Sequence, residues 1–482
     1  MKSLLYFLLS LTLVLQATAQ EKWDLRKCVD YAMKNNISVK QADVQARISA
    51  LQLKQAELAK YPNANLSSGL GVQFGRSIDR TTNIYSNTQS LYQNYQLQTG
   101  IEVYNYNRLN NNIAYAKFNA QAALADVEKA ANDASLSVCT YYLQVLAAKE
   151  QVIISQLQIG QTQIQLNLTK KKVEAGALPE LNSLEIEAQL ANDSSTYISA
   201  QTNYQQSVQS LKGVLNLDAA IPFEVVIPEA TSIPVLSFGE LQPESVYQLA
   251  LNTQPQQRAN SFRIKAAEKG IAINKAYMYP SLSLGINLST NFYNSFHKID
   301  GYTLNGYSPN GDKVNIGGTD YLINSPNVSI RQSKNSFGQI WNGYGNQLDN
   351  NFGQTVGFNV SVPIFNNGQY RIAYEQSKLT YKTQLLNKEG ADMTLKQNIY
   401  TAYSNAVSAL QKRNAGLKSV ESNQKVFDFA TKRYALGLLS TIDLLTNENN
   451  LLRSKLQQVS NEYDYIFKMK LLEFYKGQGL RL

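Results

Sequence analysis

Few residues of this chain have the types and spacing that acid–base, phosphate or metal chemistry requires. The single histidine, His297, lies in a polar stretch with no metal-ligand spacing around it. Gly69 and Gly71 do not form a phosphate-binding loop, because the pattern around them is that of a strand in which glycine permits close packing or a bend. Glu185 and Glu187 lie two residues apart, so on a helix they point in different directions. The sequence therefore predicts neither an enzyme nor a bound metal or cofactor.

The N-terminus indicates export from the cytoplasm. A basic start, the apolar run 4–15 and Ala17-Thr18-Ala19 are typical of a secretory signal peptide over residues 1–19. The run is too short for a membrane anchor, and the absence of a cysteine at the cleavage point predicts no lipid anchor. No long apolar stretch follows, which excludes a helical membrane protein, but alternating barrel strands give only a weak hydropathy signal and stay possible.

The charge distribution and the two cysteines argue against a nucleic-acid-binding protein and against a disulfide-stabilised one. The formal net charge of +9 is scattered, and the only tight basic run, 170–172, is typical of a solvated helix face and not of a nucleic-acid interface. Cys28 and Cys139 lie 111 residues apart in helical contexts, so we expect two buried free thiols in preference to a disulfide.

The chain contains one unit written twice. Tyr61-Pro62 recurs as Tyr279-Pro280, and the segment 101–117 matches 362–378 at a larger offset, which indicates an insertion in the second copy. We expect a first repeat over 20–212, a proline-rich linker over 213–242 and a second repeat over 243–482. The inserted segment, about 293–351, is expected to be a polar loop that faces the cell exterior.

Each repeat predicts a helix–strand–strand–helix order. Alternating residues predict strands at about 63–75 and 95–105, and at about 281–292 and 353–365. Long helices with apolar steps of three and four follow, with turns near Gly176 and Gly437. Pro363, Phe365 and Gly368 mark the junction where the last strand passes into a helix of nearly seventy residues, about 100 Å long.

Four strands cannot close a barrel, and an open sheet edge in lipid is very costly. Several chains must therefore contribute, and twelve strands from three chains leave room for a passage. The expected fold is mainly α with a β-barrel portion.

The stretches "SVPIFNNG" (361–368) and "RYALGLLSTIDLL" (433–445), with the two Tyr-Pro helix ends, resemble the TolC family of outer-membrane efflux proteins. The resemblance covers the whole mature chain. It implies a homotrimer in outer-membrane lipid, a twelve-stranded barrel joined to a periplasmic helical tunnel, and a periplasmic adaptor and inner-membrane transporter as partners. The scattered positive charge predicts no nucleic-acid partner.

The resemblance also implies two sets of site residues at the helix turns. Asp443 would form a ring of carboxylates at the tunnel entrance, while Asn182 takes its place in the first copy and Thr446 stands where relatives carry a second acidic residue. The alternative for Asp443 is a helix-start residue favoured by the helix dipole. Adaptor docking is implied around the turn residues Gly176, Ala177, Leu178, Gly437, Leu438 and Leu439.

The predicted function is an outer-membrane exit duct of a tripartite efflux pump. Two alternatives stay open: the duct of a type I protein secretion system, and a non-conducting coiled-coil surface protein. The latter leaves the four strands and the duplication unexplained.

Overall fold

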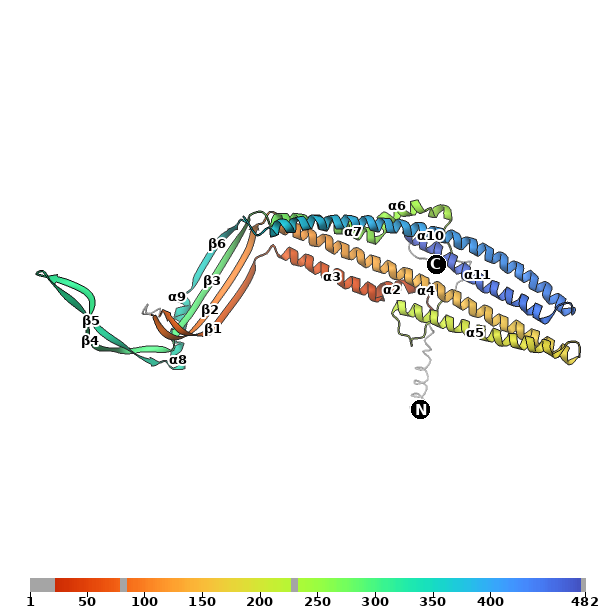
Figure 1. Cartoon of the computed structure of the whole chain (residues 1–482), viewed down its shortest axis with the longest axis horizontal. Coiled ribbons are helices and arrows are strands. Elements are labelled where there is room, and N and C mark those ends of the chain that lie inside the picture. The colour runs from red at the N-terminus through yellow and green to blue at the C-terminus, as the bar shows by residue number, and fades with distance from the viewer. Residues whose placement is uncertain (1–21, 79–84, 227–232, 478–482) are drawn as a thin grey trace, which may run out of the picture. The chain divides into compact units, whose positions relative to one another are not determined.

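The computed structural model describes residues 22–78, 85–226 and 233–477 (Figure 1). The expected signal peptide and part of the expected linker lie outside these ranges. The chain divides into a helical unit, comprising residues up to 54, 113–271 and 375–482, and a sheet unit, comprising 55–112 and 272–374. Each unit contains segments of both sequence repeats.

The helices repeat in length as the sequence repeats. The first copy has α2 (Leu25–Asn35), α3 (Ile37–Leu58), α4 (Arg108–Glu174) and α5 (Glu180–Leu215). The second has α6 (Pro243–Thr253), α7 (Pro255–Ala276), α10 (Gln369–Ala435) and α11 (Thr441–Lys476), with a short 3₁₀ helix, η2 (Phe238–Leu241), before it. The members of each pair have equal lengths of 11, 22, 67 and 36 residues. The duplication therefore extends to the secondary structure.

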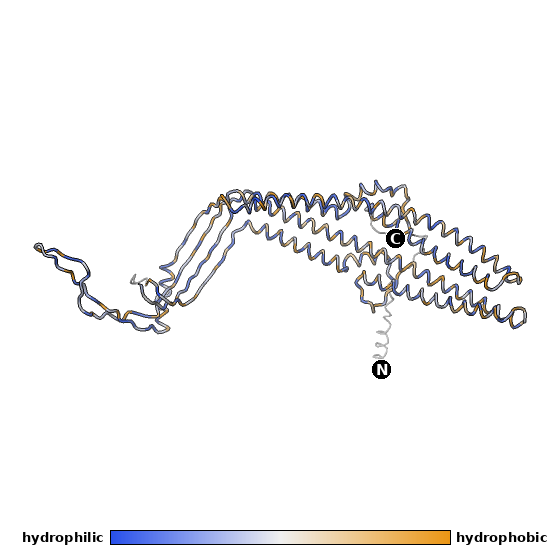
Figure 2. The backbone as a smooth tube through the Cα atoms, in the orientation of Figure 1, coloured by the Kyte–Doolittle hydropathy of each residue, from blue (hydrophilic) through white to orange (hydrophobic). Residues whose placement is uncertain are grey.

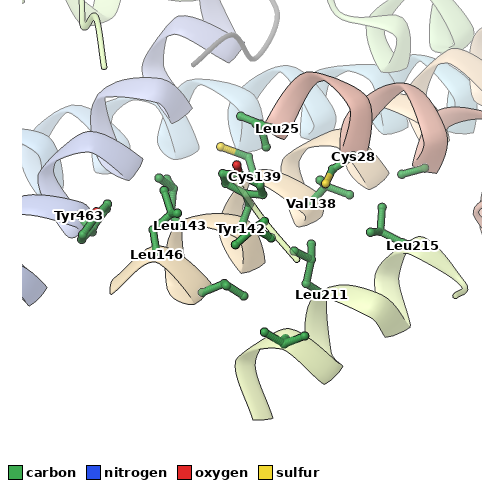
Figure 3. Packing of buried hydrophobic residues seen from close by; sticks show 14 of the residues in the cluster. Leu25, Cys28, Val138, Cys139, Tyr142, Leu143, Leu146, Leu211, Leu215 and Tyr463 are labelled. Atoms are coloured by element: carbon green, nitrogen blue, oxygen red, sulfur yellow. The ribbon is translucent and has the colours of Figure 1, made fainter. Parts of the chain in front are cut away.

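The main core of the helical unit lies where α2, α4, α5 and α11 meet (Figure 3). Tyr142 is buried there, and its hydroxyl donates a hydrogen bond to the carbonyl oxygen of Val226 at 2.6 Å. Cys28 and Cys139 are both fully buried and unbonded. Burial raises the pKa of each thiol to about 12, so both stay protonated and act as small apolar side chains.

The sheet unit contains an antiparallel sheet in the order β1 (Asn63–Ile78), β2 (Tyr85–Tyr104), β3 (Ser281–Ser295) and β6 (Gly353–Ser361) (Figure 1). Each strand has a bound that differs from expectation, and β1 and β3 end three residues later than expected, at Ile78 and Ser295. The second strand begins at Tyr85, because it pairs with the whole length of β1 although its first half is polar. The last strand ends at Ser361, opposite the first residue of β3, and Pro363 has no N–H with which to extend the ladder.

The insertion in the second copy is not the featureless loop that its composition suggested. It contains a two-stranded ribbon, β4 (His297–Ile316) and β5 (Thr319–Lys334), followed by the short helices α8 (Phe337–Ile340) and α9 (Tyr344–Asn350). The α8–α9 segment packs on the four-stranded sheet, where Phe292 stacks on Trp341 with ring centroids 5.6 Å apart. The ribbon thus leaves the sheet at the end opposite to the strand ends that join α7 and α10.

Candidate functional site

The two helix turns have the same backbone geometry. At the first, the Ala177 N–H donates to the carbonyl oxygen of Lys172 at 2.8 Å; at the second, the Leu438 N–H donates to that of Arg433 at 2.9 Å. Gly176 and Gly437 both have φ of 73°. This is the Schellman arrangement, in which the left-handed position after a helix favours glycine. The structure therefore assigns both glycines a conformational role.

The starts of the following helices differ. Ser440 caps α11: its hydroxyl accepts from the Asp443 N–H at 3.1 Å and donates to the Asp443 carboxylate at 2.7 Å. Pro179 precedes α5 and makes no side-chain cap, and Asn182 lies half-buried in the first turn. Asp443 thus makes the contact expected if it were only a residue of the helix start. Its side chain is nevertheless exposed.

The other expected turn residues divide by exposure. Leu438 is 64% exposed, and Gly176, Ala177, Gly437 and Thr446 are also exposed. Leu178 and Leu439 are half-buried, and Leu439 packs against the small cluster around Tyr434 and Leu444. The exposed part of this surface is therefore smaller than the sequence suggested.

A hydrogen bond joins the two helix hairpins near their turns. The Thr169 hydroxyl of α4 lies 3.3 Å from the Tyr434 hydroxyl of α10, and both residues are buried. The Lys172 ammonium lies 5.5 Å from the centre of the Tyr434 ring. These contacts link the first copy to the second.

Sequence reasoning missed a group of buried polar residues further from the turns, which we name the buried polar cluster: Gln158, Thr162, Asp193 and Glu448. The Gln158 amide donates to the Glu448 carboxylate at 2.6 Å, and the Thr162 hydroxyl donates to that of Asp193 at 2.5 Å. Both carboxylates are only 3% exposed. The cluster joins α4 and α5 of the first copy to α11 of the second.

The electrostatics of this cluster are unfavourable for a charge on Glu448. Burial raises the pKa of Glu448, the negative charge of Asp193 raises it further, and the bonds from Gln158 and Thr162 lower it. A signal was present in the sequence, since the apolar series of α11 misses one position between Leu445 and Leu452, where Glu448 lies.

The four-stranded sheet has one apolar and one polar face. The paired register puts Leu66, Leu97 and Leu288 in one row on the same face, and puts Asn65, Gln98 and Asn287 in the next row on the other. In Figure 2 the four strands carry no long continuous apolar run. Six apolar residues of the two edge strands are 60–75% exposed: Leu66, Leu70, Phe74, Val356, Phe358 and Val360. On β1 they extend over about 27 Å. Val72, between two of them on β1, is 40% exposed.

Side chains cross the polar face above two glycines. A Cβ added to Gly69 would lie 2.6 Å from the Asn94 side chain, and one added to Gly71 would lie 2.6 Å from the Tyr92 hydroxyl. The close packing expected at these glycines is therefore present.

The junctions between strand and long helix are built differently in the two copies. In the first, Arg108 at the start of α4 pairs with Glu102 of β2 at 2.5 Å. In the second, Pro363 and Phe365 lie between β6 and α10, Phe365 is 83% exposed, and Gly368 takes φ of 77° before the helix begins. An exposed phenylalanine at this position is available for contact with lipid or with another chain.

Within the described ranges, no three His, Cys, Asp or Glu side chains come close enough together to hold a metal ion. None of the helices that the structure describes is both long and apolar enough to cross a membrane.

Comparisons with known proteins agree with the architecture. The solved structure of CusC aligns with a TM-score of 0.70 at 15% identity, covering 94% of this chain and 91% of that one. The outer membrane protein VceC from Vibrio cholerae gives 0.69 at 14% identity, with 95% and 97% covered. These likenesses concern the fold, which is mainly helical with a strand portion as in TolC-like channels.

Sequence comparison gives the family. The alkaline protease secretion protein AprF of Pseudomonas aeruginosa is 22% identical over 371 residues, which cover 75% of this chain and 66% of AprF. The family description "Outer membrane efflux protein" matches residues 29–217 and 328–473, which is more than half of the chain. The family and its fold are those of channel proteins in the outer membrane. The chain belongs to the outer membrane efflux protein family.

Proposed function

We propose that this protein is a homotrimeric outer-membrane channel that acts as the exit duct of a tripartite pump and moves small molecules to the cell exterior. The observation that carries the proposal is the four-stranded sheet with an exposed apolar face and a polar opposite face. In water such a face would be a large unfavourable apolar surface. Its extent of about 27 Å along β1, at a strand tilt of about 35–45°, spans roughly 20 Å of an outer-membrane apolar band that is about 25 Å tall.

The sheet edges support the proposed trimer. β1 and β6 each pair on one side only in the described chain. Their free N–H and C=O groups would be unsatisfied in lipid, so pairing of β6 with β1 of a neighbouring copy is the economical solution. Three copies give twelve strands, whose polar faces would line a passage, while the long helices would extend into the periplasm.

The turns are proposed to form the periplasmic end of the duct. Three copies of the Asp443 carboxylate around one axis would repel one another and attract cations, because they carry like charges. The side chain is exposed although it bonds Ser440. The exposed turn residues, Leu438 foremost, are proposed to contact a periplasmic adaptor, which in turn would bind an inner-membrane transporter. The chain would have no catalytic role of its own.

A second candidate is the duct of a type I protein secretion system. It is favoured by the likeness to AprF, which is named as a protease secretion protein. Deletion of the gene distinguishes the two functions. If a normally secreted protein accumulates in the cell and drug sensitivity is unchanged, protein secretion is supported. If the cells become more sensitive to small toxic compounds, efflux is supported.

The trimer and its membrane face are tested with a matched pair of variants. Phe358→Lys puts a charge on the apolar face, where it costs about 2–4 kcal/mol at the bilayer midplane, and Asn359→Lys puts it on the polar face. We expect detergent-extracted wild type and Asn359→Lys to have a trimer's protein mass and to conduct ions in planar bilayers, and Phe358→Lys to be depleted from the outer membrane. A stable, non-conducting monomer of the wild type overturns the proposal.

The entrance is tested with Asp443→Asn and Asn182→Asp. Loss of the carboxylate should weaken cation preference and block by trivalent cations, with the trimer unchanged, and high salt should screen the wild-type effect. Asn182→Asp should do the reverse. Unchanged conductance, selectivity and block in Asp443→Asn would show that Asp443 serves only in the first turn of α11, where it bonds the capping Ser440.

A further inference from the structure

In the part nearest the four-stranded sheet, the ribbon of β4 and β5 has one apolar and one polar face. Paired residues lie on the same side of an antiparallel ribbon, so the register gives Tyr302 with Ile330 and Leu304 with Val328 on one face. The alternate pair Thr303 and Ser329 lies on the other. Beyond a bulge after Leu304, the apolar face continues with Tyr307 and Pro326. Nearer the hairpin turn both faces are mixed, because Lys313 pairs with Leu322 on this face and Val314 pairs with Tyr321 on the other.

This apolar face is uncovered in the single chain. Its large side chains are 42–69% exposed: Tyr302, Leu304, Tyr307, Val328 and Ile330. Among the described strands, β4 and β5 pair only with each other. A two-stranded ribbon is marginal in water by itself, and further packing of an apolar face is what stabilises such units. We therefore expect another apolar surface to cover this face in the assembled protein.

The charges of the ribbon favour a copy of itself as that surface. Its basic residues, Lys298, Lys313, Arg331 and Lys334, nearly balance its acidic residues, Asp300, Asp312 and Asp320. Some of them pair within the ribbon, as Lys313 does with Asp320 at 3.8 Å. A near-neutral ribbon does not repel its own copies, and it offers little charge by which a strongly basic or acidic partner would be recognised.

The chain path brings the copies together. One residue, Phe296, separates β3 from β4, so the ribbon, a separate two-stranded sheet, begins directly at the end of the four-stranded sheet whose open edges require neighbouring copies. In a trimer all three ribbons would leave the sheet at the same end and around the same axis. We propose that the apolar faces of the three ribbons pack against one another and form a contact between copies that narrows the outer mouth of the channel. This inference rests on the proposed trimer.

Cysteine cross-linking of the full-length protein in detergent tests the contact. Leu304→Cys and Val328→Cys place a thiol on the apolar face, and Thr303→Cys and Ser329→Cys are matched controls on the polar face. The native Cys28 and Cys139 are fully buried, so a short bis-maleimide should not reach them before quenching. We expect at least about tenfold more cross-linked dimer from the apolar-face positions than from their controls.

Equal yields on both faces, or no cross-linking on the apolar face of a material whose mass is that of a trimer, overturn the ribbon contact and leave the trimer intact. A monomer mass in all variants overturns the trimer itself. Apolar-face cross-links to a different protein, found in intact cells, also overturn the proposal in favour of a hetero-partner.

Limited proteolysis gives a second measurement. In Leu304→Ser combined with Val328→Ser, the ribbons should separate, and trypsin should cut at the exposed Lys313 about tenfold faster than in wild type, with the trimer mass retained. Thr303→Ala combined with Ser329→Ala is the control and should cut at the wild-type rate. Equal rates in the two double variants would contradict packing through the apolar face.

Discussion

The two helix hairpins of the helical unit, α4–α5 and α10–α11, have the same backbone and different chemistry. Their helices have equal lengths, and their turns share the same hydrogen bonds and the same φ at glycine. Their caps differ, since Ser440 bonds Asp443 in the second copy and Pro179 makes no such bond in the first. Duplication has preserved what the backbone requires and has left the side chains free to diverge.

The difference is larger away from the turns. Glu448 of the second copy corresponds in position to Glu187 of the first. Glu448 is 3% exposed and contacts Gln158, whereas the Glu187 side chain is 56% exposed and lies 3.6 Å from Lys170. The same residue type at the same place in the repeat is therefore a core group in one hairpin and a solvated group in the other.

The largest expected effect on stability comes from replacing Glu448, the buried member of this pair. Its pKa is raised in the folded state by burial and by Asp193. The stability that protonation contributes is complete below the ordinary glutamate pKa of about 4.5 and is lost as the pH rises through the higher folded value. We expect Glu448→Gln, which keeps an acceptor for Gln158, to flatten this pH dependence and to stabilise the helical unit by about 1–3 kcal/mol at neutral pH.

The measurement is denaturant or thermal unfolding of the trimer, followed by helical circular dichroism at a series of pH values. Glu187→Gln is the control and should change stability by less than about 0.5 kcal/mol. If Glu448→Gln were destabilising at neutral pH, the carboxylate would be ionised and well compensated in the folded protein.

The next effect tests whether the two turns are equivalent. Gly176→Ala and Gly437→Ala each force a side chain into the left-handed region, at a cost of about 1–2 kcal/mol. Neither added Cβ would meet another atom within 4 Å, so strain of the backbone is the expected cause in both. Unfolding of the two variants should therefore give equal losses. A clear inequality would mean that one turn has a partner in the assembled trimer that the other lacks.

The smallest effect concerns the caps. Ser440→Ala removes the bond to the Asp443 N–H and should cost about 1 kcal/mol. Pro179→Ser offers the first copy a cap like that of the second and should stabilise it by up to about 1 kcal/mol. Denaturant or thermal unfolding of each variant measures both changes in stability. A loss in Pro179→Ser would show that the fixed φ of proline matters more at this turn than a capping hydroxyl.

The contacts of the candidate site could be predicted from the sequence only in part. The turn glycines, the strand alternation and the junction at Pro363 follow from local rules, because φ, side-chain period and the missing N–H of proline act within a few residues. The bond between the capping Ser440 and Asp443 is equally local. A serine three residues before an aspartate was the sequence signal for it.

Tertiary structure alone decided which residues meet across the chain. Gln158 and Glu448 are 290 residues apart, and no local rule brings the Glu448 carboxylate into the core while leaving Glu187 in solvent. The early start of β2 depends likewise on the length of β1, since the polar residues that open the strand have no alternation of their own. The sequence by itself determined the repeated order of helices and strands, because periodicity is a local property. Pairing and burial required the fold, because they depend on surfaces that come from distant segments.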